Sequence, residues 1–285
     1  MASINQLQIA NMNVHYYLYP FDYFLDIQKE MGIKNIELWG SVPHLWIDHI
    51  SYEGPTPIKK KLVDYGINIV AFTPKPYNYT LCAPYETTQR KATLAYYENC
   101  IDFTVKLGVD RMCIDSMGGS FDTPYEILWN CCKDSLIHLC RIANSKGVMV
   151  VMGTARPSMS KVVTTLHELK EMMDCVACEN LKILLDTVVM SMAGETIGQW
   201  FGVFDSDIVH THFTDGRNNG YRVWGEGCYP MKKYLDELYY NGYTGYLGQN
   251  LPTEDYFTDP AEADRKNFAA IRQYFTEGND NNGID

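Results

Sequence analysis

Short apolar runs alternate along the chain with longer segments in which apolar residues recur every three or four positions. The short runs have the length of buried strands, and the longer segments have the period of amphipathic helices. Segments 21–32, 87–108 and 124–147 predict helices, and each ends on Gly, which is favoured just beyond a helix. The predicted strands cover residues 7–12, 35–40, 68–73, 111–116, 148–153, 182–187, 208–214 and 245–250.

Eight strands that alternate with helices predict an α/β protein, a (β/α)8 TIM barrel. The competing architecture is a doubly wound sheet. It is disfavoured because no GxGxxG follows the first strand, and polar clusters follow nearly every strand instead of one switch point. No Pro-, Gly- or Ser-rich linker divides residues 1–285, so we expect one domain with a frayed tail over 276–285. The long loops 74–86 and 214–229 should lie at the C-terminal face of the barrel.

Composition narrows the classes of function. The chain has 285 residues, a formal charge of −11 and no basic stripe, which argues against nucleic-acid binding. No secretory signal is visible and no apolar run approaches about 18 residues, so we expect a cytoplasmic protein without a membrane span. The nine cysteines lack framework spacing, and the CxxC of Cys175 and Cys178 has no second ligand pair. We therefore interpret them as reduced thiols.

Catalytic groups of a (β/α)8 barrel lie where its strands end. Asp186 ends the sixth predicted strand, and His210 and His212 lie in the seventh, two residues apart and therefore on one side of it. If Asp186 and His212 both point inward, they could ligate Mn²⁺, Fe²⁺, Co²⁺ or Zn²⁺. The alternative is a hydrogen-bonded pair without a metal. His210 lies deeper in the strand, and we expect a packed core histidine there.

Other polar and aromatic side chains also gather near strand ends. Glu37, on the second predicted strand, is either a base or the partner of a buried polar group, and the sequence leaves both open. Aromatic faces bind sugar rings or flat aglycones, although ordinary loop packing is the alternative for any single ring. The candidate substrate-binding rings are Trp39, Tyr77 and Trp224, and Trp46, Tyr79, Phe213 and Tyr221 lie near other strand ends.

Three arginines are candidates for substrate binding. Arg156 follows the fifth predicted strand, whereas Arg217 and Arg222 lie in the glycine-rich segment 215–227, DGRNNGYRVWGEG. Such a loop could fold over a ligand and bring an arginine to its hydroxyls or to an oxyanion. The alternative is a solvated turn.

Four segments, in order, carry a resemblance to a known family. They are NIELWGSVPH, LLDT, HTHFTDG with the GEG that follows it, and NGYTGYLGQNL. Together they resemble the xylose-isomerase-like family of sugar isomerases and epimerases, in particular the branch of fructoselysine 3-epimerase and the ketose 3-epimerases. The large subunits of C-glycoside deglycosidases are also similar. The resemblance spans roughly residues 7–275 and implies the (β/α)8 barrel.

The resemblance also implies a metal site. The family holds one divalent metal with Glu, Asp, His and Glu at the ends of the later strands, and the two Glu move a proton on the carbon beside a carbonyl. Asp186 and His212 match the family Asp and His, but Gly153 and Asn250 stand where the two Glu are expected. Asn250 offers only a neutral oxygen. We therefore expect a weak divalent site, for Mn²⁺ above other ions, formed by Asp186, His212 and Asn250.

Three functions follow from the resemblance and its departures. The first is an isomerase- or epimerase-like enzyme that removes a proton beside the carbonyl of a keto-sugar or sugar conjugate, with a base drawn from His44, Glu37, Asp115 or Asp215. The second is a C-glycoside deglycosidase subunit, which would act on a 3-oxo-sugar by α-deprotonation and elimination and pair with a small second subunit. The third is a non-catalytic sugar-binding or regulatory barrel. We expect an oligomer in each case.

Overall fold

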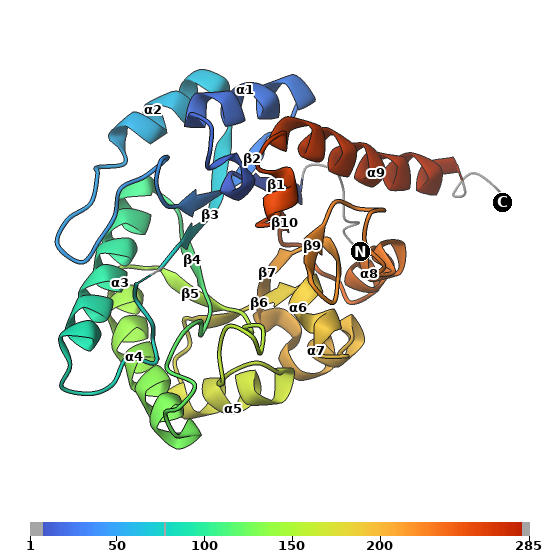
Figure 1. Cartoon of the computed structure of the whole chain (residues 1–285). Coiled ribbons are helices and arrows are strands. Elements are labelled where there is room, and N and C mark those ends of the chain that lie inside the picture. The colour runs from blue at the N-terminus through green and yellow to red at the C-terminus, as the bar shows by residue number, and fades with distance from the viewer. Residues whose placement is uncertain (1–7, 77, 281–285) are drawn as a thin grey trace.

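The computed structural model describes residues 8–76 and 78–280, and its parallel strands close into a barrel (Figure 1). Around the barrel the order is β1-β10-β7-β6-β5-β4-β3-β2, which confirms the (β/α)8 fold and excludes the doubly wound sheet. The strands are β1 (Ile9–Met12), β2 (Asn35–Gly40), β3 (Asn68–Pro74), β4 (Arg111–Ile114), β5 (Met149–Met152), β6 (Leu181–Asp186), β7 (Ile208–His212) and β10 (Leu247–Gln249).

Helices surround the barrel and alternate with its strands (Figure 1). The glycines predicted as stop signals act as such after α1 and α3, where Gly32 and Gly108 adopt the left-handed conformation that favours glycine. After α4, Lys146 intervenes before Gly147. The helices are α1 (Phe21–Met31), α2 (Thr56–Tyr65), α3 (Thr88–Leu107), α4 (Tyr125–Ser145), α5 (Leu166–Val176), α6 (Thr187–Met192), α7 (Ile197–Phe204), α8 (Met231–Tyr240) and α9 (Pro260–Asp280).

Two segments differ from the sequence-based expectation. The segment after β7 contains a short antiparallel hairpin, β8 (Asp215–Arg217) and β9 (Gly220–Arg222), instead of an irregular loop. Helix α9 extends through Asp280, so the first part of the expected frayed tail is helical, and residues 281–285 lie outside the described residues.

A buried polar clasp joins the first and last parts of the chain. The Asp264 carboxylate of α9 accepts hydrogen bonds from Tyr16 and Gln28 at 2.7 and 2.8 Å, and His15 Nε2 lies 2.9 Å from it. His15 and Tyr16 belong to a short 3-10 helix (Val14–Tyr16) after β1, and Gln28 belongs to α1. The clasp fixes α9 beside α1, next to the pairing of β1 with β10 (Figure 1).

The barrel interior is layered. Ala71, Cys113, Val151 and Leu184 form an apolar layer inside the strands. Next to it lies a polar group around Glu37 and His210, both of which are fully buried. All nine cysteines are free thiols, as expected. In residues 8–76 and 78–280, no helix has the length and apolar character that a bilayer span requires.

Candidate functional site

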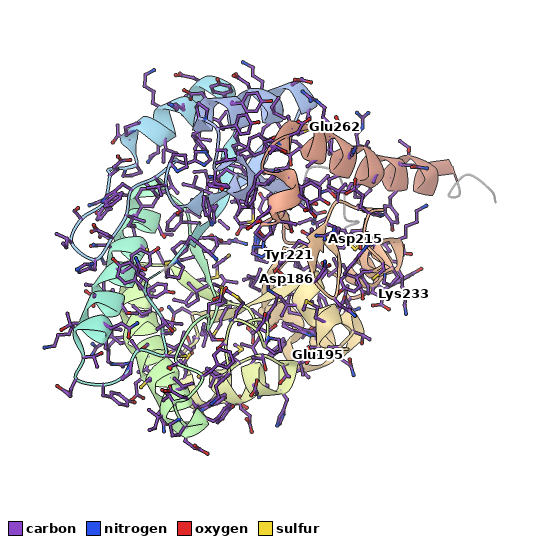
Figure 2. All side chains as sticks on the ribbon, viewed as in Figure 1. Asp186, Glu195, Asp215, Tyr221, Lys233 and Glu262 are labelled. Carbon is purple, nitrogen blue, oxygen red and sulfur yellow. The ribbon has the colours of Figure 1, made fainter. Side chains whose placement is uncertain are left out.

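A cavity of about 620 Å³ opens at the C-terminal end of the barrel. Residues from the ends of all eight barrel strands or from the loops after them line it, so it lies where a (β/α)8 barrel carries its chemistry. Figure 2 shows Asp186 and Tyr221 near the centre of the ring of strands. The polar residues that the sequence predicted for the site and that line the cavity are Asp115, Arg156, Asp186, His212 and Asn250.

Asp186 and His212 meet as the sequence predicted. They are register partners on the adjacent strands β6 and β7, and Asp186 Oδ2 lies 3.4 Å from His212 Nδ1. The other carboxylate oxygen, Oδ1, caps α6 by accepting hydrogen bonds from the backbone N–H groups of Val188 and Val189. Tyr221, from the hairpin, donates its hydroxyl to Asp186 Oδ2 at 3.0 Å. Asp186 is therefore held in place by the backbone, a ring nitrogen and a phenol.

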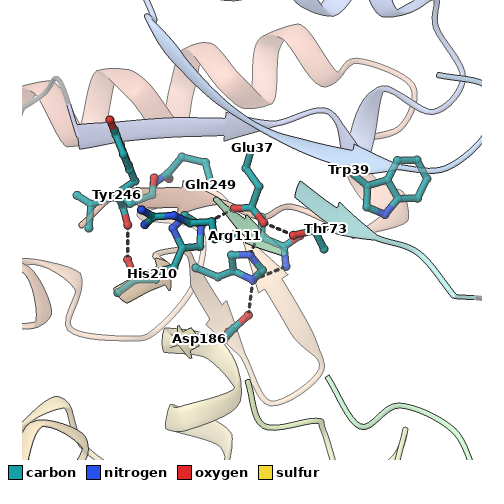
Figure 3. Close-up of polar contacts among 12 residues, drawn as sticks. Glu37, Trp39, Thr73, Arg111, Asp186, His210, Tyr246 and Gln249 are labelled. Atoms are coloured by element: carbon teal, nitrogen blue, oxygen red, sulfur yellow. Dashed lines mark hydrogen bonds and ion pairs between the residues drawn. The ribbon is translucent and has the colours of Figure 1, made fainter. Parts of the chain in front are cut away.

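Glu37 lies on the side of His212 opposite to Asp186 and accepts hydrogen bonds at both oxygens (Figure 3). Its Oε1 lies 3.0 Å from His212 Nε2 and accepts the Thr73 hydroxyl, and its Oε2 lies 2.7 Å from His210 Nε2. The side chain is fully buried and does not line the cavity. Of the two roles left open by the sequence, this geometry favours the partner of buried polar groups over the base.

The charges of Glu37, His210 and His212 shift the pKa values of one another. Burial by itself would raise the pKa of Glu37, but the nearby His212 and His210 outweigh it and hold that pKa well below its usual range. Burial would lower the pKa of His212, but the Glu37 charge and the contact with Asp186 raise it to about 10. Burial lowers the pKa of His210, against the pull of Glu37. His212 is thus a cation between two carboxylates, and His210 is a packed neutral histidine.

The donor set suits a weakly held divalent cation. His212 directs Nδ1 to the cavity side while Glu37 holds Nε2, which is the usual outer contact of a metal-binding histidine. Asn250 Nδ2 lies 3.3 Å from Nδ1, and half a turn of the amide presents its oxygen there instead. Asp186 is the single carboxylate of the three. A cation at Nδ1 must also displace the proton that Nδ1 carries.

A second group with metal-ligand chemistry lies deeper in the barrel. Glu37, Cys113 and His210 bring one donor atom each to within 4.8 Å of one another, and all three are buried. Both oxygens of Glu37 already accept hydrogen bonds, although His210 Nδ1 has no partner among the described residues. We describe this group as part of the hydrogen-bonded layer that positions His212.

Asp115 is the acidic side chain of the cavity best suited to proton transfer. It follows β4, and its carboxylate accepts a hydrogen bond from the backbone N–H of Met117 at 2.9 Å. Burial raises its pKa above the usual range, and the nearby Lys75 opposes that rise. Lys75 and Tyr97 line the same cavity. A carboxyl group with a raised pKa in a cavity is typical of a general acid or base.

The wall between Asp115 and Asp186 is formed by the end of β5. Gly153 lines the cavity there and offers no side chain. A Cβ atom at this position would lie 3.3 Å from both the Cδ2 and the backbone oxygen of Leu184, which is close. Thr154 and Arg156, the next polar residues, also line this wall.

Besides Glu37, two other proposed bases lie outside the cavity. His44 is buried between Asn13 and the backbone oxygen of Tyr19, at 2.7 and 2.8 Å, and burial lowers its pKa. Asp215 is 2% exposed and accepts four backbone N–H groups of the segment after it, from Gly216, Gly225, Gly227 and Tyr229. Both side chains therefore hold loops in place and do not face a ligand.

The remaining predicted substrate contacts divide between the cavity and the surface. Trp39 lines the cavity, whereas Tyr77 lies outside the described residues. Arg217 is exposed and donates to the backbone oxygen of Glu226 at 3.0 Å, and Arg222 donates to the backbone oxygen of Tyr221 and pairs with Asp255. Trp224 packs against Phe213 and Tyr274. The structure does not bring these last three to the cavity.

The cavity also contains residues that the sequence did not single out for the site. Tyr97 lies in the middle of α3, and a helix interior carries no strand-end signal. Tyr221 was visible only as one of many aromatic residues near strand ends. The signal that could have found it is the hairpin itself, which returns the chain from Arg217 at its turn to the cavity.

Comparison with known proteins gives a consistent result. The profile of the xylose isomerase-like TIM barrel family matches residues 25–274. Fructoselysine 3-epimerase of Shigella flexneri is 24% identical over 247 residues, which cover 85% of this chain and 88% of that protein. The structure of the 3-keto-D-glucoside 4-epimerase YcjR of E. coli superposes with a TM-score of 0.77 at 17% identity, covering 93% of this chain and 99% of that one. The IolI protein with a bound zinc atom gives 0.76 at 16%, covering 95% and 98%.

Proposed function

The chain belongs to the xylose isomerase-like TIM barrel family, and from this premise we propose that it moves a proton on the carbon beside the carbonyl of a keto-sugar or sugar conjugate. The observation that carries the proposal is the placement of Asp115, whose raised pKa suits proton transfer, in the same cavity as the Asp186–His212 pair. The named epimerases among the relatives support the same class of reaction.

Asp115 would act as the base. It follows β4, and Asp186 and His212 end β6 and β7, so a sugar above Gly153 on β5 would lie between the two groups. The Asp115 carboxylate takes the proton from carbon, and the electron pair of that C–H bond moves to the carbonyl oxygen. His212, beside Asp186, donates a hydrogen bond to that oxygen. Protonation of the same carbon on the opposite face, by a group other than Asp115, gives the epimer. Protonation of the neighbouring carbon, with transfer of that carbon's hydroxyl proton to the former carbonyl oxygen, gives the isomer.

Asp186, His212 and the Asn250 amide could instead hold a divalent cation, with Mn²⁺ as our first choice, which would take the place of the His212 hydrogen bond to the carbonyl oxygen. Such an ion supplies Lewis-acid polarisation of a carbonyl. The zinc in the IolI structure supports a divalent ion in this fold but does not identify it. With one carboxylate among three donors, we expect weak binding.

Solvent exchange tests the proposal directly. The protein is incubated in D₂O, with and without Mn²⁺, with fructoselysine, D-fructose, D-tagatose and a 3-keto-glucoside, and NMR follows deuterium at the carbon beside the carbonyl. We expect exchange in at least one sugar, and Asp115→Asn should slow it about 100-fold or more. Asp122→Asn, on an exposed residue, is the matched control. Absence of exchange across the panel would overturn the proposal.

A non-catalytic sugar-binding subunit is the second candidate. Gly153 and Asn250 favour it, because neither can act as a base. It predicts saturable sugar binding with no deuterium incorporation, and Asp115→Asn would then leave binding unchanged.

A C-glycoside deglycosidase subunit is the third candidate. A neighbouring cavity of about 280 Å³, which Lys75 shares with the first and which Trp46, Tyr79 and Tyr96 line, favours a substrate with an aromatic aglycone. This function predicts release of the aglycone from a 3-oxo-C-glycoside. Light scattering of the purified protein, alone and with co-expressed small partners, tests the expected oligomer and second subunit. The free thiols fit the cytoplasmic location that we propose.

A further inference from the structure

Two polar side chains on the β5 wall of the cavity have no hydrogen bond or ion pair with the residues that the structure describes. Thr154 is 6% exposed, and its hydroxyl has no hydrogen bond with any described residue. Arg156 is half-buried, and its guanidinium lies 5.8 Å from the centre of the Tyr221 ring. Within the described part of the chain, no carboxylate pairs with it. A nearly buried hydroxyl without a partner is costly unless a ligand bonds to it, and the Arg156 guanidinium lines the same cavity.

Two of the three acidic residues that line the cavity already have partners, and the third, Glu254, is an exposed residue after β10. Asp186 is engaged by Tyr221 and His212, and Asp115 by the backbone of Met117 with Lys75 nearby. Arg156 is therefore a cation of this wall that has no ion pair with a described residue. Its own backbone is fixed, since its carbonyl oxygen accepts the N–H groups of Met159 and Ser160 at 2.8 and 3.1 Å. The guanidinium is thus carried by a rigid turn.

Space and charge next to this pair admit an anion. Gly153 precedes Thr154 and offers no side chain to the cavity, and Asn250 across the cavity is neutral. A single planar guanidinium with one hydroxyl suits a carboxylate, which accepts two parallel N–H groups. A phosphate dianion would ask for more donors, and Asp115 and Asp186 would repel it more strongly.

We infer that the ligand is a keto-sugar bearing a carboxylate, which Arg156 and Thr154 bind beside Gly153. The inference rests on the proposed function for the sugar part of the ligand. The carboxylate could belong to the sugar itself, as in a ketohexuronate, or to an amino acid joined to it. In both cases the anion would bind on the β5 wall and leave the carbonyl between Asp115 and His212.

Matched ligand pairs test the inference by calorimetry. D-fructuronate is compared with D-fructose, and fructosylglycine with its amide, so that each pair differs by the charged group alone. In at least one of the two pairs, we expect the ligand with the carboxylate to bind at least tenfold more tightly than the neutral ligand. Arg156→Gln should abolish that preference and leave the neutral sugar within about twofold, and Thr154→Val should reduce it several-fold. Which pair responds identifies the source of the carboxylate.

Controls keep this inference separate from the proposed reaction. Arg141→Gln, on the exposed side of α4, should change nothing. Thermal unfolding verifies that each variant is folded, and Arg156→Lys, which keeps the charge, should retain part of the preference. Equal affinity within both pairs, or tighter binding of D-fructose 6-phosphate than of both carboxylates, would overturn the inference. A carboxylate preference without deuterium exchange would uphold the inference and overturn the proposed enzyme.

Discussion

Gly153 and Asn250 each stand where the family resemblance implies a glutamate. The cavity therefore carries no negative charge at these two positions. Asp186 is left as the one carboxylate beside His212 Nδ1. The two positions differ in the room they offer. A side chain at Gly153 would approach Leu184 at 3.3 Å, where Cδ2 can move but the backbone oxygen cannot. Adding a carboxylate there therefore carries a packing cost.

The double variant Gly153→Glu with Asn250→Glu should bind Mn²⁺ at least tenfold more tightly than the parent chain, because two added carboxylates strengthen a divalent site. Isothermal titration with MnCl₂ measures the change. Gly153→Ala separates crowding at Leu184 from the effect of charge and should not tighten binding. An unchanged affinity in a folded double variant would mean that these positions do not face Asp186 and His212.

Asp115 gives the reaction its expected pH dependence. Burial raises its pKa above the usual range of an aspartate, so the carboxylate form, which is the base, forms only at a correspondingly higher pH. The exchange rate should therefore rise with pH as this carboxyl group ionises. Lys75 lowers this pKa, so Lys75→Met should move the rising limb to higher pH. Exchange measured from pH 4 to about pH 8 tests both shifts. If Lys75→Met leaves the rising part of the pH profile unchanged, Asp115 is not the titrating base.

At the scale of elements, Asp215 shows what one buried carboxylate does for a loop. Its four accepted N–H groups tie residues 216, 225, 227 and 229 to one point, and a Cβ atom on Gly227 would collide with it at 2.0 Å. Gly227 thus serves a close approach of the backbone to the Asp215 carboxylate. Arg217 is directed back to the same segment through Glu226.

Asp215→Asn should destabilise the protein by about 2 kcal/mol, because the amide group would place N–H donors against backbone N–H donors. Urea unfolding gives the change in free energy. Hydrogen exchange should show faster exchange at Gly225 and Gly227 and little change in the strands. If these amides stay protected, Asp215 does not organise the loop. Asp122→Asn again provides a surface control.

The sequence predicted the strands well because each is an apolar run bounded by turn residues, and it predicted the meeting of Asp186 with His212 because parallel strand ends converge. It did not separate side chains that face the cavity from those that hold loops. His44 and Asp215 both follow strands, yet His44 contacts Asn13 and the backbone oxygen of Tyr19, and Asp215 accepts backbone N–H groups of its own loop. Such pairing depends on loop conformation, which periodicity does not encode.

For the whole molecule, closure of the barrel depends on segments from opposite ends of the chain. Strand β10 pairs with both β1 and β7, and Asp264 on α9 holds the elements that follow β1. The pKa of Tyr16 is raised, by burial first and then by the Asp264 charge, so its hydroxyl stays a donor to that carboxylate.

Asp264→Asn should lower the free energy of unfolding by about 3 kcal/mol, since it removes a buried charge that three side chains share. Urea denaturation measures the loss. Asp259→Asn, an exposed residue of the same region, should cost less than about 1 kcal/mol. If both variants lose a similar free energy of unfolding, the stabilisation comes from α9 itself and not from the clasp.

The position of β10 in the barrel has a consequence for biosynthesis. When the ribosome has made the chain as far as α8, seven parallel strands exist and the sheet still has two open edges, at β1 and β7. Both edges present unsatisfied backbone groups that another nascent chain could join. Only when residues 247–249 and then Asp264 leave the exit tunnel do both edges disappear together. Closure of the barrel is therefore a late event in folding, and a chaperone has the most to protect before it.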